Sequence, residues 1–202
     1  RKIILALIWL TLALPATAAQ FTIQIGNITW SGSPGGYQCF NNTAYPNTIN
    51  FTITKTDDYT RTYAVTAGTS ATSGSYNRQL ASGANRLNYQ LYTTSAMSYV
   101  LQAPNTATAN NVIGGTAVGA TGTVIPLSFT LFVPTGQGVP PGTYTDTVII
   151  GVRSAYNSGT VLTSQTITIR VIVPATAVLS IVPTGGGFSS STSQTLNFGQ
   201  LA

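Results

Sequence analysis

Carboxylate side chains can act as acids, bases and metal ligands, and this chain has three of them: Asp57, Asp58 and Asp146. It has no histidine and a single cysteine, Cys39. General acid–base catalysis needs a titratable group placed against the substrate, and His- or Cys-rich metal sites need several such ligands. We therefore expect a protein that is not an enzyme, with no cofactor and no metal.

Asp57 and Asp58 are adjacent, and their oxygen atoms could in principle bind Ca²⁺. Two neighbouring acids after a strand pattern are more typical of a solvated turn. We favour the turn at Thr56-Asp57-Asp58 over a calcium site.

The N-terminal residues have the features of a secretory signal peptide. Arg1 and Lys2 precede an uncharged apolar run, Ile3–Leu14, and the small-residue stretch Pro15–Ala19 follows. The run is shorter than the roughly 20 apolar residues that a transmembrane helix needs. We expect cleavage after Ala18 or Ala19 and export from the cell. In an exported chain the odd cysteine indicates a partner thiol elsewhere or a free thiol, and both remain open.

The charge balance is weakly basic. The formal net charge is +5, and without the two basic residues of the signal peptide it falls to about +3. The remaining basic residues are dispersed, so no cluster could follow a phosphate backbone: Lys55, Arg61, Arg78, Arg86, Arg153 and Arg170. We expect no nucleic-acid partner and no small-molecule substrate.

Apolar residues alternate with polar residues in several short stretches, as in half-buried strands. These stretches are Phe21–Trp30 with a shift at Gly26, Ile49–Ile53, Tyr63–Val65, Leu87–Tyr92, Leu127–Val133, Tyr144–Arg153 and Thr166–Val173. No useful helix-period run follows the signal peptide. The fold class is all-β, an immunoglobulin-like antiparallel β-sandwich of about seven or eight strands.

Two stretches lack a convincing strand period and are expected to be loops: Thr66–Gly83 and Thr93–Thr123. The second is uncharged and carries aliphatic residues spaced by glycine. Either it covers the core of the sandwich or it exposes apolar tips that bind a surface. The candidate binding residues are Val112, Ile113 and Val118, followed by Met97, Tyr99 and Trp30.

The stretch Gly138–Arg153 is the most informative in the chain. Pro140 and Pro141 restrict the backbone, Gly142 permits a turn, and the residues that follow are rich in β-branched side chains. One face of the expected strand becomes apolar halfway along it and is expected to enter the core: Tyr144, Asp146, Val148, Ile150 and Val152.

Composition changes again after this strand and the next. Pro174–Ala177 is typical of a linker, Val178–Val182 begins a further strand, and Thr195–Gly199 follows a Gly- and Ser-rich break. We expect three parts: a signal peptide over 1–19, a sandwich domain over 20–174, and over 175–202 a linker with the start of a second, truncated domain.

The string Gly142-Thr143-Tyr144-Thr145-Asp146-Thr147 resembles the signature of spore coat protein U domains, which are pilin-like subunits of archaic chaperone–usher pili. Pro134–Gln137 and Leu196–Gly199 are similar to other patterns of that family. Many members carry a cysteine pair, whereas this chain has only Cys39.

The resemblance implies a secreted, non-catalytic pilus protein. Polymerising subunits of the family lack a final strand and borrow one from the next subunit. Here the chain supplies a strand of its own, through Ile167, Ile169, Val171 and Val173, so the order resembles the two-domain tip adhesin. That identity implies surface attachment and biofilm formation through exposed hydrophobic loops, on an abiotic or host surface.

The same resemblance implies the partners and the location. They are other pilus subunits, a periplasmic chaperone and an outer-membrane usher, with transit through the periplasm to a pilus on the cell surface. Two alternatives remain open. One is a polymerising shaft or coat subunit assembled by donor-strand complementation. The other is a carbohydrate-binding β-sandwich that stacks sugars on Trp30, Tyr37 or Tyr99.

Overall fold

The computed structural model describes residues 20–31, 36–38, 45–103, 109–155 and 159–175. The predicted signal peptide, Cys39 and the expected second domain lie outside these residues. The described part contains eleven strands and one short 3₁₀ turn, Ala109–Asn111, which confirms the all-β class. None of its helices is long and apolar enough to cross a membrane.

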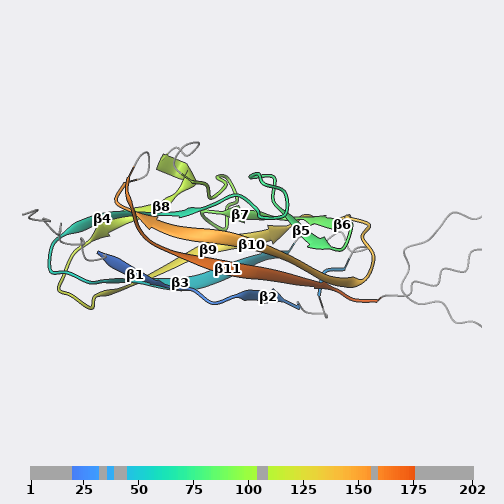
Figure 1. Cartoon of the computed structure of the whole chain (residues 1–202), viewed down its shortest axis with the longest axis horizontal. Helices are drawn as coiled ribbons and strands as arrows, with labels where there is room; N and C mark the ends of the chain where they lie inside the picture. Colours follow the sequence, from blue (N-terminus) through green and yellow to red (C-terminus); the bar gives the residue numbers. More distant parts are fainter. Residues whose placement is uncertain (1–19, 32–35, 39–44, 104–108, 156–158, 176–202) are drawn as a thin grey trace, which may run out of the picture.

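The strands form two sheets that pack face to face as a sandwich (Figure 1). The first has the order β1-β3-β9-β7, with β1 Phe21–Gln24, β3 Tyr45–Lys55, β7 Gln90–Tyr92 and β9 Val124–Val133. The second has the order β2-β11-β10-β4-β8, with β2 Ile28–Trp30, β4 Arg61–Ala67, β8 Ile113–Ala117, β10 Gly142–Arg153 and β11 Val161–Val173. The short strands β5 (Gln79–Ser82) and β6 (Asn85–Asn88) extend it beside β10.

Alternation of side chains places the core between the sheets. The inward residues of β10 and β11 are buried, including Tyr144, Ile150, Ile167 and Ile169. They face a layer from the first sheet that contains Phe21, Phe51, Phe129 and Leu131. Burial of each large apolar side chain stabilises the fold by about 1.5–3 kcal/mol.

The chain changes sheets around Gly26, where the sequence predicted a shift within one strand. β1 pairs antiparallel with β3, from Phe21↔Lys55 to Gln24↔Thr52. After Ile25–Asn27 the chain joins the other sheet, where β2 pairs in parallel with β11 at Ile28↔Ile169. All the other strand pairs are antiparallel.

Three local predictions are wrong. The expected loop Thr66–Gly83 contains β5, and the expected loop Thr93–Thr123 contains β8, an edge strand that pairs with β4. Its Gly114 and Gly115 give no apolar alternation, so the pairing comes from the neighbouring strand. The expected single strand Leu87–Tyr92 is divided, because the chain leaves the second sheet after β6 and enters the first sheet as β7.

The sandwich has two distinct ends (Figure 1). We call one the turn end; there the turn 56–60 joins β3 to β4 and the turn 118–123 joins β8 to β9. β11 begins at this end and runs about 40 Å to the opposite end, which we call the exit end because the chain leaves the domain there. At the exit end the Tyr37 backbone N–H donates to the Ile172 carbonyl, and its hydroxyl donates to the Pro134 carbonyl.

Candidate functional site

The signature strand β10 has an inner and an outer face with different roles. Tyr144 is buried, and its hydroxyl donates a 2.8 Å hydrogen bond to the Pro140 carbonyl, which holds the turn that starts the strand. Thr143 and Thr147 point outward and are exposed, Thr145 is half-buried, and Gly142 has a φ of 157° at the start of the strand. These residues shape the strand and contribute no reactive group.

Asp146 is the one acidic residue of the signature, and it is buried. It accepts hydrogen bonds from the Tyr89 hydroxyl at 2.6 Å and from the Thr72 backbone N–H at 3.0 Å. Burial, and then the hydrogen bond to Asp146, raise the pKa of Tyr89 well above its usual range. Both carboxylate oxygens are therefore engaged in holding neighbouring segments.

Arg78 is buried near this pair and bonds to backbone carbonyls. One of its Nη atoms donates to the carbonyls of Gly68 and Leu101, each at 2.7 Å, and the other donates to the Gln90 side chain. Burial lowers the pKa of Arg78. This guanidinium joins segments on both sides of β5 and acts as a structural crosslink.

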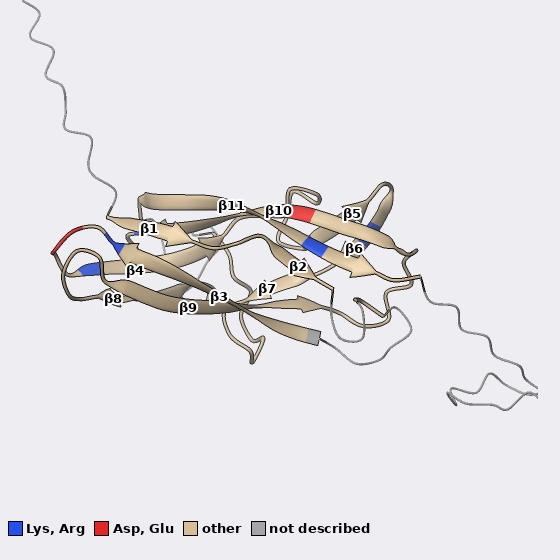
Figure 2. Cartoon of the chain, turned by 90° about the horizontal axis from the view of Figure 1, so that it is seen from below, with Lys and Arg blue, Asp and Glu red and all other residues tan. Residues whose placement is uncertain are grey.

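The main cluster of charge lies at the turn end (Figure 2). Asp57 forms ion pairs with Lys55 at 3.2 Å and with Arg61 at 2.7 Å. Lys55 is buried, and its Nζ also donates to the Tyr59 carbonyl. The hydrogen bond from Arg61 holds the pKa of Asp57 below its usual value. These contacts fix the turn 56–60, and they confirm the turn expected at Asp57-Asp58.

A second set of bonds ties this turn to the turn 118–123. Asp58 accepts from the backbone N–H of Thr121 at 2.7 Å and from its hydroxyl at 2.9 Å. The two bonds lower the pKa of Asp58. Gly119 and Gly122 have φ of 100° and 89°, which favour glycine in the second turn. The two turns therefore form one braced unit. In the described part of the chain, no group of three or more His, Cys, Asp or Glu side chains is placed to hold a metal ion.

The braced unit displays hydrophobic side chains. Tyr59 is 70% exposed and Val118 is 64% exposed, one on each turn. The Arg61 guanidinium lies over the Tyr59 ring, 5.1 Å from its centroid. Val124 and Val161, at the first positions of β9 and β11, are also exposed at this end. Together Tyr59, Val118, Val124 and Val161 form what we call the turn-end surface.

The predicted binding residues do not form one group. Val118 is exposed, as a binding residue must be, whereas Val112 and Trp30 are only 7% and 8% exposed, so these two are removed from the candidate surface. Trp30 packs edge-on against Tyr37 with ring centroids 6.1 Å apart. Burial of both rings also leaves them unavailable as sugar-stacking platforms.

The other three candidates lie elsewhere. Ile113 is half-buried on β8, opposite Val65. Met97 is half-buried and Tyr99 is exposed, both in the segment that follows β7. Sequence reasoning missed Tyr59, although an aromatic residue directly after the Asp57-Asp58 turn is a signal that could have found it.

The last strand, β11, lies between β10 and β2. Its ladder with β10 extends from Gly142↔Val173 to Arg153↔Val161. All four of its predicted inward residues are buried: Ile167, Ile169, Val171 and Val173. The chain's own strand therefore fills the place beside β10.

Comparison with known families places the chain. The Spore Coat Protein U domain model matches residues 14–151, more than half of the sequence. The chain belongs to this family. The match includes the signature Gly142–Thr147 and ends within β10, so β11 lies beyond the part that the Spore Coat Protein U domain model matches.

Among curated proteins, none matches the chain. Solved structures that resemble this Spore Coat Protein U domain include the CooA pilin subunit from enterotoxigenic Escherichia coli. It is 13% identical with a TM-score of 0.41, over 77% of this chain and 99% of the pilin. The enterotoxigenic E. coli adhesin CfaE is 11% identical with a TM-score of 0.39, over 79% of this chain and 50% of the adhesin. A PapD-like domain of human CEP192 is 7% identical with a TM-score of 0.37, over 87% and 99%. At these scores the likenesses carry no argument about function.

Proposed function

We propose that this protein is a non-catalytic pilus-associated subunit that occupies the fibre tip and attaches to surfaces through its turn-end surface. Family membership supports the pilus-associated role. The single observation that carries the tip position is β11, which fills the place beside β10 with a strand from the same chain. A subunit that receives a donor strand would need that place open.

The geometry of the two ends supports the adhesive role. The chain leaves β11 at the exit end, and the turn-end surface lies at the opposite end of the sandwich. If the rest of the fibre is attached through the exit end, Tyr59 and Val118 face away from it. Buried apolar area contributes about 25 cal/mol per Å², so a few side chains bind weakly and many subunits bind strongly.

The proposal extends to assembly, location and role. The partners are other pilus subunits, a periplasmic chaperone and an outer-membrane usher, and the chain passes through the periplasm to a pilus on the cell surface. The contacted material is an abiotic or host surface. Attachment by many such tips would support biofilm formation.

Binding to untreated hydrophobic plastic tests the adhesive role. We expect Tyr59→Asp and Val118→Asp together to reduce binding at least about tenfold, because each carboxylate loses hydration on an apolar surface. Ile149→Asp is the matched control, since Ile149 is 54% exposed but lies on the outer face of β10. An equal loss of binding in the control would rule out the turn end as the adhesive surface.

Unfolding of a fragment over Gln20–Val182, which keeps the apolar segment that follows β11, tests the tip position. A self-complete sandwich should unfold reversibly in one transition without any added peptide. A fragment that folds only with a donor peptide would instead support the alternative, a polymerising shaft or coat subunit.

A further inference from the structure

Among the described strands, one edge of the sandwich is left unpaired where the N-terminal strand changes sheets. β1 covers the edge of β3 only from Thr52 to Lys55. Over Tyr45–Phe51, β3 pairs with β9 on one side, and no described strand pairs with it on the other. β2 likewise has β11 on one side and no described strand on its other side. Two strand edges, one from each sheet, thus face one gap.

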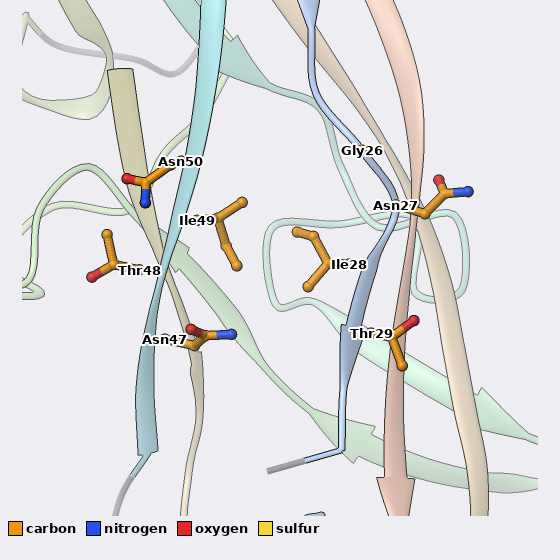
Figure 3. A pocket seen from close by; sticks show the side chains of 8 residues that line it. All are labelled: Gly26, Asn27, Ile28, Thr29, Asn47, Thr48, Ile49 and Asn50. Atoms are coloured by element: carbon orange, nitrogen blue, oxygen red, sulfur yellow. The ribbon is translucent and has the colours of Figure 1, made fainter. Parts of the chain in front are cut away.

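The gap is a cleft of about 310 Å³. It is lined by eight residues of β2, β3 and the link before β2: Gly26, Asn27, Ile28, Thr29, Asn47, Thr48, Ile49 and Asn50. Figure 3 shows Ile28 and Ile49 pointing toward one another across it. None of the lining residues is charged.

The inward side chains of β3 are less buried beside the gap than beside β1. Phe51 and Ile53 point inward and are buried, in the part of the strand that lies nearest to β1. Asn47 and Ile49 point inward as well but are only half-buried. The core is therefore incomplete along the open part of β3, and the spare hydrogen-bonding groups of that edge would be available to another strand.

The dimensions of sandwiches suit one strand in such a gap. Sheets that pack face to face lie about 10 Å apart, and hydrogen-bonded strands lie about 4.8 Å apart. One added strand can therefore bridge two edges that belong to different sheets. Its inward side chains would cover Ile49, which is half-buried, and would pack beside Ile28, which is already buried.

We propose that residues Val178–Val182 of this chain dock in the cleft as a strand between β2 and β3. The sequence Val-Leu-Ser-Ile-Val is rich in β-branched residues and has no charge, like the cleft. The whole stretch 176–202, which lies outside the described residues, is uncharged. The strand that the sequence predicts from Val178 needs hydrogen-bonding partners. The edges of β2 and β3 that face the cleft could provide them.

The start of this segment lies within reach of the cleft. β11 ends at the exit end, where β3 begins. Tyr37 hydrogen-bonds both to Ile172, near the end of β11, and to Pro134, the residue directly after β9. The end of β9 pairs with the start of β3, so the ends of β11 and β9 and the start of β3 lie close together. The four residues Pro174–Ala177 span about 13 Å when extended. A chain that turns back there would run parallel to β3 and antiparallel to β2.

Docking would have a mechanical consequence for a fibre subunit. The segment that leaves the sandwich would be hydrogen-bonded along its length to two strands, so a pulling force on residues after Val182 would load several backbone bonds together. The first domain and whatever follows it would then be held in a fixed relation.

Hydrogen exchange in the full chain tests the proposal. We expect the amides of Asn47–Asn50 that point away from β9 to be protected by at least about tenfold relative to exposed amides. Ser180→Pro should abolish this protection, since a strand with partners on both sides uses every N–H and proline has none. Ser191→Pro is the matched control and should leave the protection unchanged.

The amides of β10 and β11 serve as an internal check that the Ser180→Pro variant is folded. Free exchange of the β3 edge in the unmodified chain would overturn the proposal, as would protection that survives Ser180→Pro. Protection that disappears on dilution would also overturn it, because the occupant would then be a second copy of the chain. None of these readouts depends on adhesion.

Discussion

The Tyr89 hydroxyl donates a 2.6 Å hydrogen bond to the Asp146 carboxylate in the interior of the sandwich. Tyr89 lies where the chain passes from β6 to β7, so it stands between the two sheets. The other carboxylate oxygen accepts the Thr72 N–H. One acidic residue of the signature strand thus holds both the segment after β4 and the crossing between the sheets.

Removal of this acceptor should destabilise the domain. Asp146→Ala leaves two buried donors without a partner, and at about 1–3 kcal/mol for each we expect a loss of about 2–6 kcal/mol. Tyr89→Phe should cost about 1.5–3 kcal/mol, because the lost bond is to a charged group. Urea unfolding of the two single variants and the double variant measures both. If the two losses simply add, the residues are not coupled in the way that the hydrogen bond requires.

Alkaline pH should weaken the fold through Tyr89. Burial raises its pKa in the folded state above the usual value of 10.0. Below pH 10 the tyrosine is protonated in both states, and its contribution is fully present. Above pH 10 the unfolded chain ionises first, so the free energy of unfolding falls by about 1.4 kcal/mol per pH unit until the folded pKa is reached. Tyr89→Phe should show a shallower fall between pH 10 and 11, and an unchanged slope would contradict the assignment.

Acid should loosen the brace between the two turns. The pKa of Asp58 is lowered below 3.8 by the backbone N–H of Thr121 and then by its hydroxyl. A lowered folded pKa gives a contribution that is present above about pH 3.8 and is lost as the pH falls through the folded value. Thr121→Val removes the hydroxyl alone, so the NMR titration midpoint of Asp58 should rise partway toward 3.8.

Asp57 is the control in the same titration. The pKa of Asp57 is lowered first by Arg61, so its midpoint should not move in the Thr121→Val variant. A common shift of both carboxyl groups would indicate that the substitution disturbed the whole turn end.

Adjacent residues of β11 should differ sharply in their effect on stability. Ile169 is buried between the sheets, and Ile169→Ala should cost about 2–5 kcal/mol through lost burial and a cavity. Thr168→Ala, one position away on the outer side, should cost less than about 0.5 kcal/mol. Thermal or urea unfolding gives both values. Similar small losses would mean that β11 does not complete the core.

The sequence predicted the features that depend on local alternation. Val148, Ile150 and Val152 recur every second residue, and a strand turns every second side chain to the same face, so their burial follows once the segment is extended. The inward face of β11 follows in the same way. The all-β class and the family signature also needed no tertiary information.

The alternation of apolar and polar residues does not indicate which strand a segment pairs with. The pairing of strands could therefore not be predicted from the sequence. The run Leu87–Tyr92 alternates throughout, yet the structure divides it between two sheets. The Gly-rich strand β8 has no alternation at all and exists because β4 offers it an edge. Both outcomes depend on residues far away in the chain.

By itself, then, the sequence determined the fold class, the faces of the long strands and the family, because these follow from the order of neighbouring residues. Only the tertiary structure decided which apolar residues reach the surface. Trp30 and Val112 are buried, while Tyr59 and Val118 are exposed on the two turns that the Asp58–Thr121 hydrogen bonds join. Exposure is set by whatever packs against a residue, and local order does not carry that information.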